Sequence, residues 1–202
     1  MDSSDLYRDI TDFAHGTPLW VQSAFEVWSE YGLLLFGLLY IAVWWRARAD
    51  DGPRAVALAV LAPLVTALAY VASELVKSTV DEERPCRAVA GALAPLLPCP
   101  PSGDWSFPSN HSAIAAAAAV SLALAVPRLA WLTLPMALLM AFSRVYVGAH
   151  YPHDVAMGLL LGASLGTLAV LALAGPLTRV VAAMRGSGNG VVVWFTGPGP
   201  AR

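Results

Sequence analysis

Long apolar segments with few charges constrain this chain more than any other feature of its sequence. A helix needs about 20 mainly apolar residues to cross the hydrocarbon core of a bilayer. The segments that approach this length lie at residues 32–45 (extended upstream toward Phe25), 55–76, 112–142 and 155–174. The third is too long for one span, because a helix rises about 1.5 Å per residue, and Pro127-Arg128 at its middle predicts a tight turn. Its two halves reach spanning length only if their polar ends, 110–112 and 143–147, are helical. The sequence therefore predicts five spans.

Composition places the chain among membrane proteins. Of its 202 residues, 57% are hydrophobic and 13% are charged, whereas soluble domains carry about 45–50% apolar and roughly 25% charged residues. The expected fold is an all-α, polytopic transmembrane helical bundle. We expect one membrane-embedded domain at residues 1–175 and a cytoplasmic C-terminal tail at 176–202. The arginines are dispersed without a basic patch, which argues against a nucleic-acid partner.

The N-terminal region predicts neither a secretory signal peptide nor a complete span. The opening "MDSSDLYRDITDF" is acidic and lacks the positive region and apolar core of a signal peptide. Residues 16–28 are too polar to span, so we expect an interfacial segment there, with Trp20 and Trp28 at headgroup level. This segment could supply part of a sixth helix. The short β-branched run at 191–195 is assigned no role.

The distribution of basic residues predicts the orientation of the five spans. One side would hold the N-terminus and the loops 77–111 and 143–154, and its basic residues are Arg8, Lys77, Arg84, Arg87 and Arg144. The other side would hold the loop 46–54, the turn at Pro127-Arg128 and the C-terminal tail, with Arg46, Arg48, Arg54, Arg128, Arg179, Arg185 and Arg202. Basic residues favour the cytoplasmic side of short loops, so we expect the second side to be cytoplasmic in a plasma (inner) membrane protein. Trp44-Trp45 would mark its aromatic belt.

Both cysteines, Cys86 and Cys99, lie in the loop 77–111. That loop is predicted to face outside, where an oxidising compartment permits a disulfide. Two free thiols are the equally open alternative, because the sequence does not give the separation of the two residues.

Polar residues gather at the helix ends that the predicted topology brings to the outer face. These residues are Lys77, Arg84, Ser109, Asn110, His111, Ser143, Arg144, His150 and Asp154. Taken singly they are ordinary: cations snorkel at interfaces, and Ser-Asn is a common helix N-cap. Taken together, three cations and a helix N-terminus form an anion site, and arginine suits phosphate oxygens in particular. A metal site from His111, His150, His153 and Asp154 is the alternative, but the three cations would repel a metal ion. We therefore expect no metal and no cofactor.

The spacing of His150 and Asp154 predicts a catalytic pair. Residues four apart on a helix are within reach of one another, and Pro152 is tolerated if the helix begins nearby. A carboxylate on one imidazole nitrogen fixes the tautomer and leaves the other nitrogen free to attack. His111 is then the candidate general acid. We interpret His153 as an interfacial residue and His15 as a polar residue of the N-terminal segment.

Three motifs carry a family resemblance. "KSTVDEERP" has the pattern K-x6-R-P, "PSNH" is close to PSGH, and "SRVYVGAHYPHD" has the pattern S-R-x5-H-x3-D. In this order the motifs resemble those of the type 2 phosphatidic acid phosphatase superfamily, whose members are metal-independent and mostly all-helical, with six core helices. The resemblance implies that His150 is the nucleophile and forms a phosphohistidine, that Asp154 orients it and that His111 is the general acid. It assigns the phosphoryl group to Lys77, Arg84, Ser109, the Asn110 backbone and Arg144.

Asn110 departs from the glycine that is usual in the second motif. Asparagine is the next best residue if that backbone is left-handed. A polar residue before this histidine also resembles the bacterial undecaprenyl pyrophosphate phosphatases, so the departure favours polyprenyl pyrophosphate as the lipid substrate. Phosphatidate or phosphatidylglycerophosphate is the alternative substrate.

A transport or lipid-binding protein without turnover is the alternative outside the enzymes, since charged residues in membrane segments also mark transport pathways. A nucleophile and a general acid would be superfluous in such a protein. Gly158, Gly162 and Gly166 follow at four-residue spacing. They predict either a homodimer face or, as we favour, close packing inside the bundle.

Overall fold

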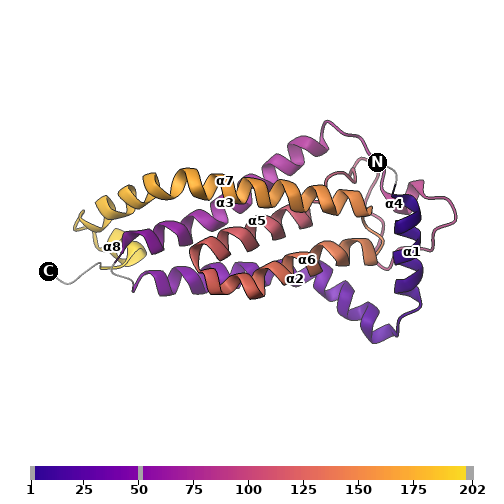
Figure 1. The fold of residues 1–202 in the computed structure, drawn as a ribbon, viewed down its shortest axis with the longest axis horizontal. Helices are drawn as coiled ribbons and strands as arrows, with labels where there is room; N and C mark the ends of the chain where they lie inside the picture. Colours follow the sequence, from indigo (N-terminus) through magenta and orange to yellow (C-terminus); the bar gives the residue numbers. More distant parts are fainter. Residues whose placement is uncertain (1–2, 50–51, 199–202) are drawn as a thin grey trace.

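The computed structural model describes residues 3–49 and 52–198, and this part of the chain is helical without a strand. The long helices α3, α6 and α7 run roughly along the long axis of the molecule, while α1 lies across one end, near α4, and α8 lies at the other end (Figure 1). Their bounds are α1 Ser4–His15, α2 Leu19–Ala47, α3 Pro53–Lys77, α4 Pro85–Ala88, α5 Asn110–Ala125, the 3₁₀ turn η1 Pro127–Leu129, α6 Ala130–Tyr146, α7 Pro152–Arg185 and α8 Gly190–Thr196. The prediction of an all-α bundle is confirmed.

Four helical segments in the described chain are long and apolar enough to cross a membrane: α2, α3, the segment Pro127–Tyr146 and α7. The remaining predicted span, the first half of the run 112–142, corresponds to α5, which is apolar but has only 16 residues. It packs against α3, α6 and α7, and its run of alanines is buried. Small side chains let these neighbours approach closely, so α5 is the central helix of the bundle.

The predicted turn at Pro127-Arg128 is confirmed. Helix α5 ends at Ala125, and η1 leads directly into α6. Residues 110–112 form the first turn of α5 and residues 143–146 the last turn of α6. These polar ends therefore extend the two halves of the apolar run, as their length requires.

The three spaced glycines of α7 pack inside the bundle. A Cβ atom at Gly162 would lie 2.1 Å from the carbonyl oxygen of Ala113, and one at Gly158 would lie 2.5 Å from that of Ser109. Gly166 also faces α5, at Ala117. The prediction of internal packing is confirmed, and this stripe is not free to form a dimer face.

Residues 16–28 belong mostly to a longer helix. Helix α2 is continuous from Leu19 to Ala47, while the separate N-terminal helix is α1. The placement of Trp20 and Trp28 at headgroup level stays a prediction. Two polar side chains in the first part of α2 bond to other parts of the protein. Gln22 donates to the carbonyls of Ala14 and Thr17, and the Ser29 hydroxyl accepts from Arg144. These bonds tie the first part of α2 to α1 and to α6.

The C-terminal part is more ordered than the sequence indicates. Helix α7 continues past the predicted span end at Ala174, through Pro176, to Arg185. The run at 191–195 lies in α8, which returns against α2: the Trp44 indole donates to the Phe195 carbonyl at 3.2 Å. The guanidinium carbon of Arg48 lies 4.7–5.1 Å from the ring centroids of Trp44, Trp45 and Trp194. Cation–π contacts of this kind fasten the tail to the bundle.

Candidate active site

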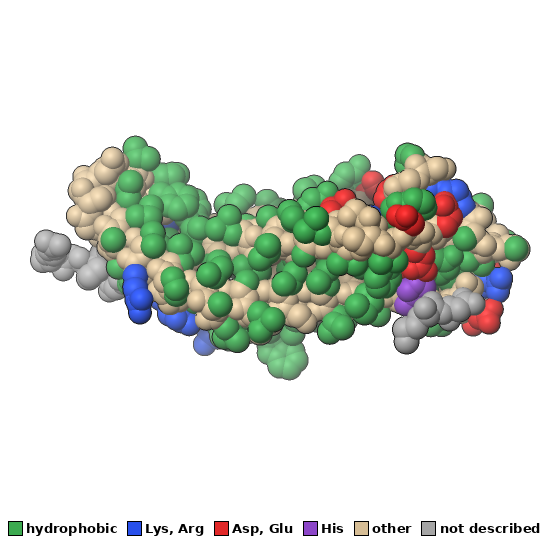
Figure 2. Space-filling model, turned by 90° about the horizontal axis from the view of Figure 1, so that it is seen from above, with side chains coloured by type: hydrophobic (Ala, Val, Ile, Leu, Met, Phe, Trp, Pro, Cys, Tyr) green, Lys and Arg blue, Asp and Glu red, His purple; other side chains and the backbone are tan. Residues whose placement is uncertain are grey.

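A pocket of about 220 Å³ lies at the end of the bundle opposite α8, and six of the predicted site residues line it. Acidic side chains and a histidine gather at this end, as Figure 2 shows. The lining consists of Tyr70, Lys77, Arg84, Pro100, Asp104, Asn110, His111, Ile114, Arg144 and His150. The topology therefore brings together the ends of α3, α5 and α6 with the loop before α7.

His150 and Asp154 form the predicted pair, buried to 2% and 0% exposure. His150 Nδ1 lies 3.2 Å from Asp154 Oδ2. The contact arises from a cap, because α7 begins only at Pro152 and His150 precedes it. Asp154 reaches back from the first turn, where its Oδ2 also accepts the Tyr151 backbone N–H at 2.9 Å and the Ser106 hydroxyl.

The other imidazole nitrogen of His150 faces the cations. Arg84 donates from one guanidinium nitrogen to His150 Nε2 at 2.9 Å and to the Ala149 carbonyl at 3.0 Å. Burial, followed by the charges of Arg84, Arg144 and Lys77, holds the pKa of His150 well below its ordinary value. The ring is therefore neutral at pH 7, with a lone pair on Nε2. Such a nitrogen is a nucleophile.

Arg144 is the second buried cation at the pocket, with 7% of its surface exposed. One of its terminal nitrogens donates to Ser29 at 2.6 Å, while its Nε has no hydrogen-bond partner among the described residues. A buried donor left unpaired is costly, and an anion in the pocket would supply the missing acceptor. Sequence analysis missed Ser29, because the residues next to it in the sequence do not indicate a contact with α6.

Asp104 is the acidic residue that sequence analysis missed in this pocket. Its Oδ1 lies 2.9 Å from an Arg84 nitrogen and 3.5 Å from the Lys77 amine, and the Arg84 Nε donates to its carbonyl. Burial opposes ionisation, but the hydrogen bond and charge of Arg84 and the charge of Lys77 outweigh it and hold the pKa of Asp104 below its ordinary value. Asp104 stands in a proline-rich loop at no periodic spacing from the motifs, so no local pattern indicates it.

The start of α5 supplies the remaining predicted residues. His111 lines the pocket. Ser109 lies outside the lining: it is the N-cap, and its hydroxyl oxygen accepts from the backbone N–H of Ser112 at 3.5 Å. Its phosphate contact stays a prediction. Ser143 is buried and donates to the Met140 carbonyl at 2.7 Å.

The conformational reason considered for Asn110 is wrong. No non-glycine residue of the described chain has a positive φ, and Asn110 is the first helical residue of α5. Its side-chain oxygen instead accepts from Ser73 at 2.6 Å, and its side-chain nitrogen donates to Glu74. Asparagine here ties the start of α5 to the end of α3, which a glycine could not do.

His153 lies apart from the pocket. Its Nε2 is 2.8 Å from Glu82 Oε1 and 3.3 Å from Asp154 Oδ1, and its Nδ1 is 2.7 Å from the Ser3 hydroxyl. The alternative metal set is thereby split, because His111 and His150 line the pocket and His153 does not. Glu82, His153 and Asp154 do bring three ligand-type atoms within 4.8 Å, but His153 contacts both carboxylates directly through its Nε2.

Cys86 and Cys99 form a disulfide, with Cα atoms 6.1 Å apart. The bridge closes the loop between α3 and α5, from which both Arg84 and Asp104 reach the pocket. Arg87, another cation of this side, is occupied on the loop itself, where it contacts Glu83 and donates to the Pro101 carbonyl at 2.8 Å.

Comparisons with known proteins identify relatives of this chain. The profile of the PAP2 superfamily matches residues 58–175. An undecaprenyl-diphosphatase of Sulfolobus acidocaldarius is 37% identical over 115 residues, 56% of this chain and 54% of the relative. The undecaprenyl-diphosphatase BcrC of Bacillus subtilis is 27% identical over 81% of this chain and 80% of the relative. The chain thus aligns with about half of the first relative's length.

A solved structure shares the fold. The transmembrane PAP2-type phosphatidylglycerolphosphate phosphatase from Bacillus subtilis superimposes with a TM-score of 0.60 at 24% identity, over 82% of this chain and 83% of that one. At this identity the likeness shows the arrangement of helices. Together with the profile match and the three motifs around the pocket, it establishes that the chain belongs to the PAP2 superfamily.

Proposed function

We propose that this chain is a metal-independent lipid phosphatase that hydrolyses polyprenyl (undecaprenyl) pyrophosphate to the monophosphate and inorganic phosphate. The observation that carries the proposal is the arrangement around His150: a carboxylate on Nδ1, and an unprotonated Nε2 whose lone pair accepts a hydrogen bond from the Arg84 guanidinium at 2.9 Å. Nucleophile, orienting group and anion clamp thus occupy one pocket.

The first step is attack of His150 Nε2 on the terminal phosphorus. The new N–P bond forms as the bond from phosphorus to the bridging oxygen breaks, and the electron pair stays on that oxygen. His111 donates a proton to it, and the lipid monophosphate leaves. Asp154 stabilises the positive charge on the imidazole, while Arg84, Lys77 and Arg144 stabilise the charge on the phosphoryl oxygens.

The second step is hydrolysis of the phosphohistidine. A water molecule gives a proton to His111 and attacks phosphorus, and the N–P bond breaks with its electrons returning to His150 Nε2. Inorganic phosphate is released, and both histidines recover their starting protonation. One water molecule is consumed in each cycle.

A lipid pyrophosphate suits the location and the lining of the pocket. Tyr70 and Ile114 give the cationic pocket an apolar wall, and the pocket lies at one end of a bundle of apolar helices. Two of the relatives are named undecaprenyl-diphosphatases. The phosphatidylglycerolphosphate phosphatase that shares the fold supports the second candidate substrate, a phosphatidate or phosphatidylglycerophosphate.

We infer further that the pocket faces the extracytoplasmic side of the plasma membrane. The end with α8 and η1 carries most of the arginines, which favour the cytoplasm, and a disulfide beside the pocket suits an oxidising compartment. Impermeant thiol reagent applied after reduction should label Cys86 in intact cells. Labelling only in broken cells would place the pocket on the inside.

The decisive experiment is phosphate release by the purified chain in EDTA. Undecaprenyl pyrophosphate, phosphatidylglycerophosphate and phosphatidate are supplied side by side at equal surface concentration. We expect turnover in EDTA, fastest with the pyrophosphate. Loss of activity in EDTA would refute the metal-independent mechanism, and binding without release from any of the three lipids would favour the anion-binding or transport alternative.

A further inference from the structure

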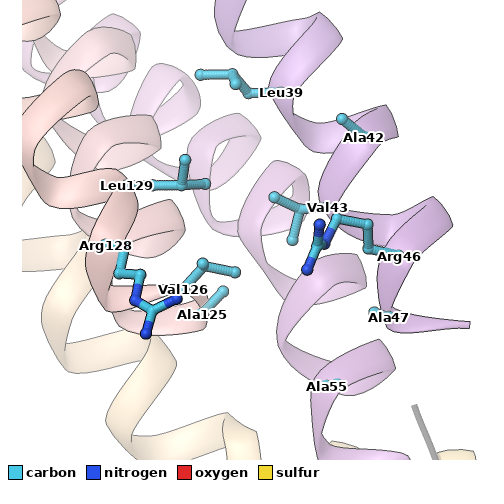
Figure 3. A pocket seen from close by; sticks show the side chains of 10 residues that line it. All are labelled: Leu39, Ala42, Val43, Arg46, Ala47, Ala55, Ala125, Val126, Arg128 and Leu129. Carbon is cyan, nitrogen blue, oxygen red and sulfur yellow. The ribbon is translucent and has the colours of Figure 1, made fainter. Parts of the chain in front are cut away.

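A second cavity, of about 510 Å³, lies at the opposite end of the bundle, between α2 and the turn that joins α5 to α6. It is larger than the pocket around His150. Leu39 and Val43 form its wall on α2, and Val126 and Leu129 form the facing wall, as Figure 3 shows. These two walls are apolar, and a volume of this size can hold part of a hydrocarbon chain.

Two arginines stand over this apolar cavity. Arg46 comes from the last turn of α2 and Arg128 from η1, and in Figure 3 their guanidinium groups approach the opening from opposite sides. Neither forms an ion pair or a side-chain hydrogen bond with the residues that the structure describes. As far as the described residues go, each guanidinium thus retains its donors for an external anion.

The charge of the described residues at this end also favours an anion. The described acidic residues lie toward the α1 end, in α1, the first part of α2, the end of α3, the following loop and the start of α7. Figure 2 shows basic side chains at the other end of the molecule. Basic pockets between membrane helices recognise phosphate headgroups of lipids, and arginine binds phosphate oxygens in bidentate fashion.

We propose that this cavity is a binding site for an anionic phospholipid, distinct from the catalytic pocket. One acyl chain occupies the apolar cavity, and the headgroup phosphate bridges Arg46 and Arg128. The bound lipid then links α2 to the α5–α6 turn, which the cavity otherwise separates here. A lipid explains the combination of walls and rim better than free phosphate, which would leave the apolar cavity empty.

The test uses the full chain in detergent, titrated with phosphatidylglycerol or phosphatidylcholine and read by native mass spectrometry. We expect one phosphatidylglycerol to be retained in preference to phosphatidylcholine. Arg46→Gln with Arg128→Gln should weaken its binding by roughly tenfold or more, since a basic residue near an anionic headgroup contributes about 1 kcal/mol. The matched control, Arg54→Gln with Arg179→Gln, removes two exposed arginines of the same end that do not line the cavity and should bind as the parent does.

A second variant separates the acyl chain from the headgroup. Ala42→Trp fills the cavity beside Val43 and keeps both guanidinium groups, so it should weaken phosphatidylglycerol binding as the double arginine variant does. Equal loss in the control pair would reduce the effect to general charge and overturn the proposal. So would displacement of the lipid by glycerol 3-phosphate at the same concentration, because that competitor has no acyl chain. Thermal unfolding of each variant identifies any that fails to fold. If the double arginine variant does not fold, Ala42→Trp tests the proposal instead.

Discussion

Asp104→Asn tests the anion site most directly, because Asp104 occupies the pocket as a counter-ion. Its carboxylate lies 2.9 Å from Arg84 and 3.5 Å from Lys77, and a substrate phosphate would compete for the same two cations. The asparagine side chain has nearly the same shape but no charge. We therefore expect the variant to bind phosphate more tightly than the parent.

The magnitude follows from the distances and the exposure. The Asp104 side chain is 44% exposed, so the attraction is that of a water-like environment, about 1 kcal/mol for each contact. The substitution does not remove all of this attraction, because the asparagine oxygen can still accept a hydrogen bond from Arg84 and solvent screens the two cations. A net gain of about 1–2 kcal/mol corresponds to roughly 5- to 30-fold tighter binding.

The assay is calorimetric titration of the purified chain with inorganic phosphate, together with KM for the lipid pyrophosphate. Asp81→Asn is the matched control, since Asp81 is an exposed acid of the same loop outside the pocket lining. It should change neither value by more than about twofold. Weaker phosphate binding in Asp104→Asn would refute the reasoning, because it would mean that Asp104 positions Arg84 for the substrate.

Three further predictions concern the histidines and the helix packing. His150→Ala should abolish turnover while His153→Ala retains most of it, measured as phosphate release from the lipid; equal losses would contradict the assignment of the nucleophile. In the free protein the pKa of His150 is lowered by burial and by the nearby cations, so its imidazole should remain neutral as the pH falls through 6.5, and a ring-nitrogen NMR titration with a midpoint at or above 6.5 would disprove this. Gly162→Ala should lower the midpoint of thermal unfolding and cost about 1–3 kcal/mol, because the added Cβ would lie 2.1 Å from the Ala113 carbonyl oxygen. Gly175→Ala is its control, since a Cβ there meets no atom within 4 Å, and an equal decrease in both variants would show that the effect is not one of packing.

The sequence determined the class of the fold and six of the residues that line the pocket. The length of the apolar segments predicts membrane helices. Successive spans cross in opposite directions, so the polar residues at every second connection lie on the same face. For this reason Lys77, His111, Arg144 and His150 could be assigned to one site before the structure was known. The pair His150–Asp154 was found from its spacing, although a helix cap makes the contact.

Only the tertiary structure decided which partners the polar side chains around the pocket have. Asp104 meets Arg84, Ser29 meets Arg144, and Glu82 meets His153 across long stretches of chain with no shared period. The full length of α2 was missed for a related reason, because the partners of Gln22 and Ser29 lie on other elements. Periodicity reports how one segment faces its surroundings, whereas these contacts depend on how loops and helices pack against one another. That packing also produces the cavity beneath Arg46 and Arg128, which no motif in the sequence indicates.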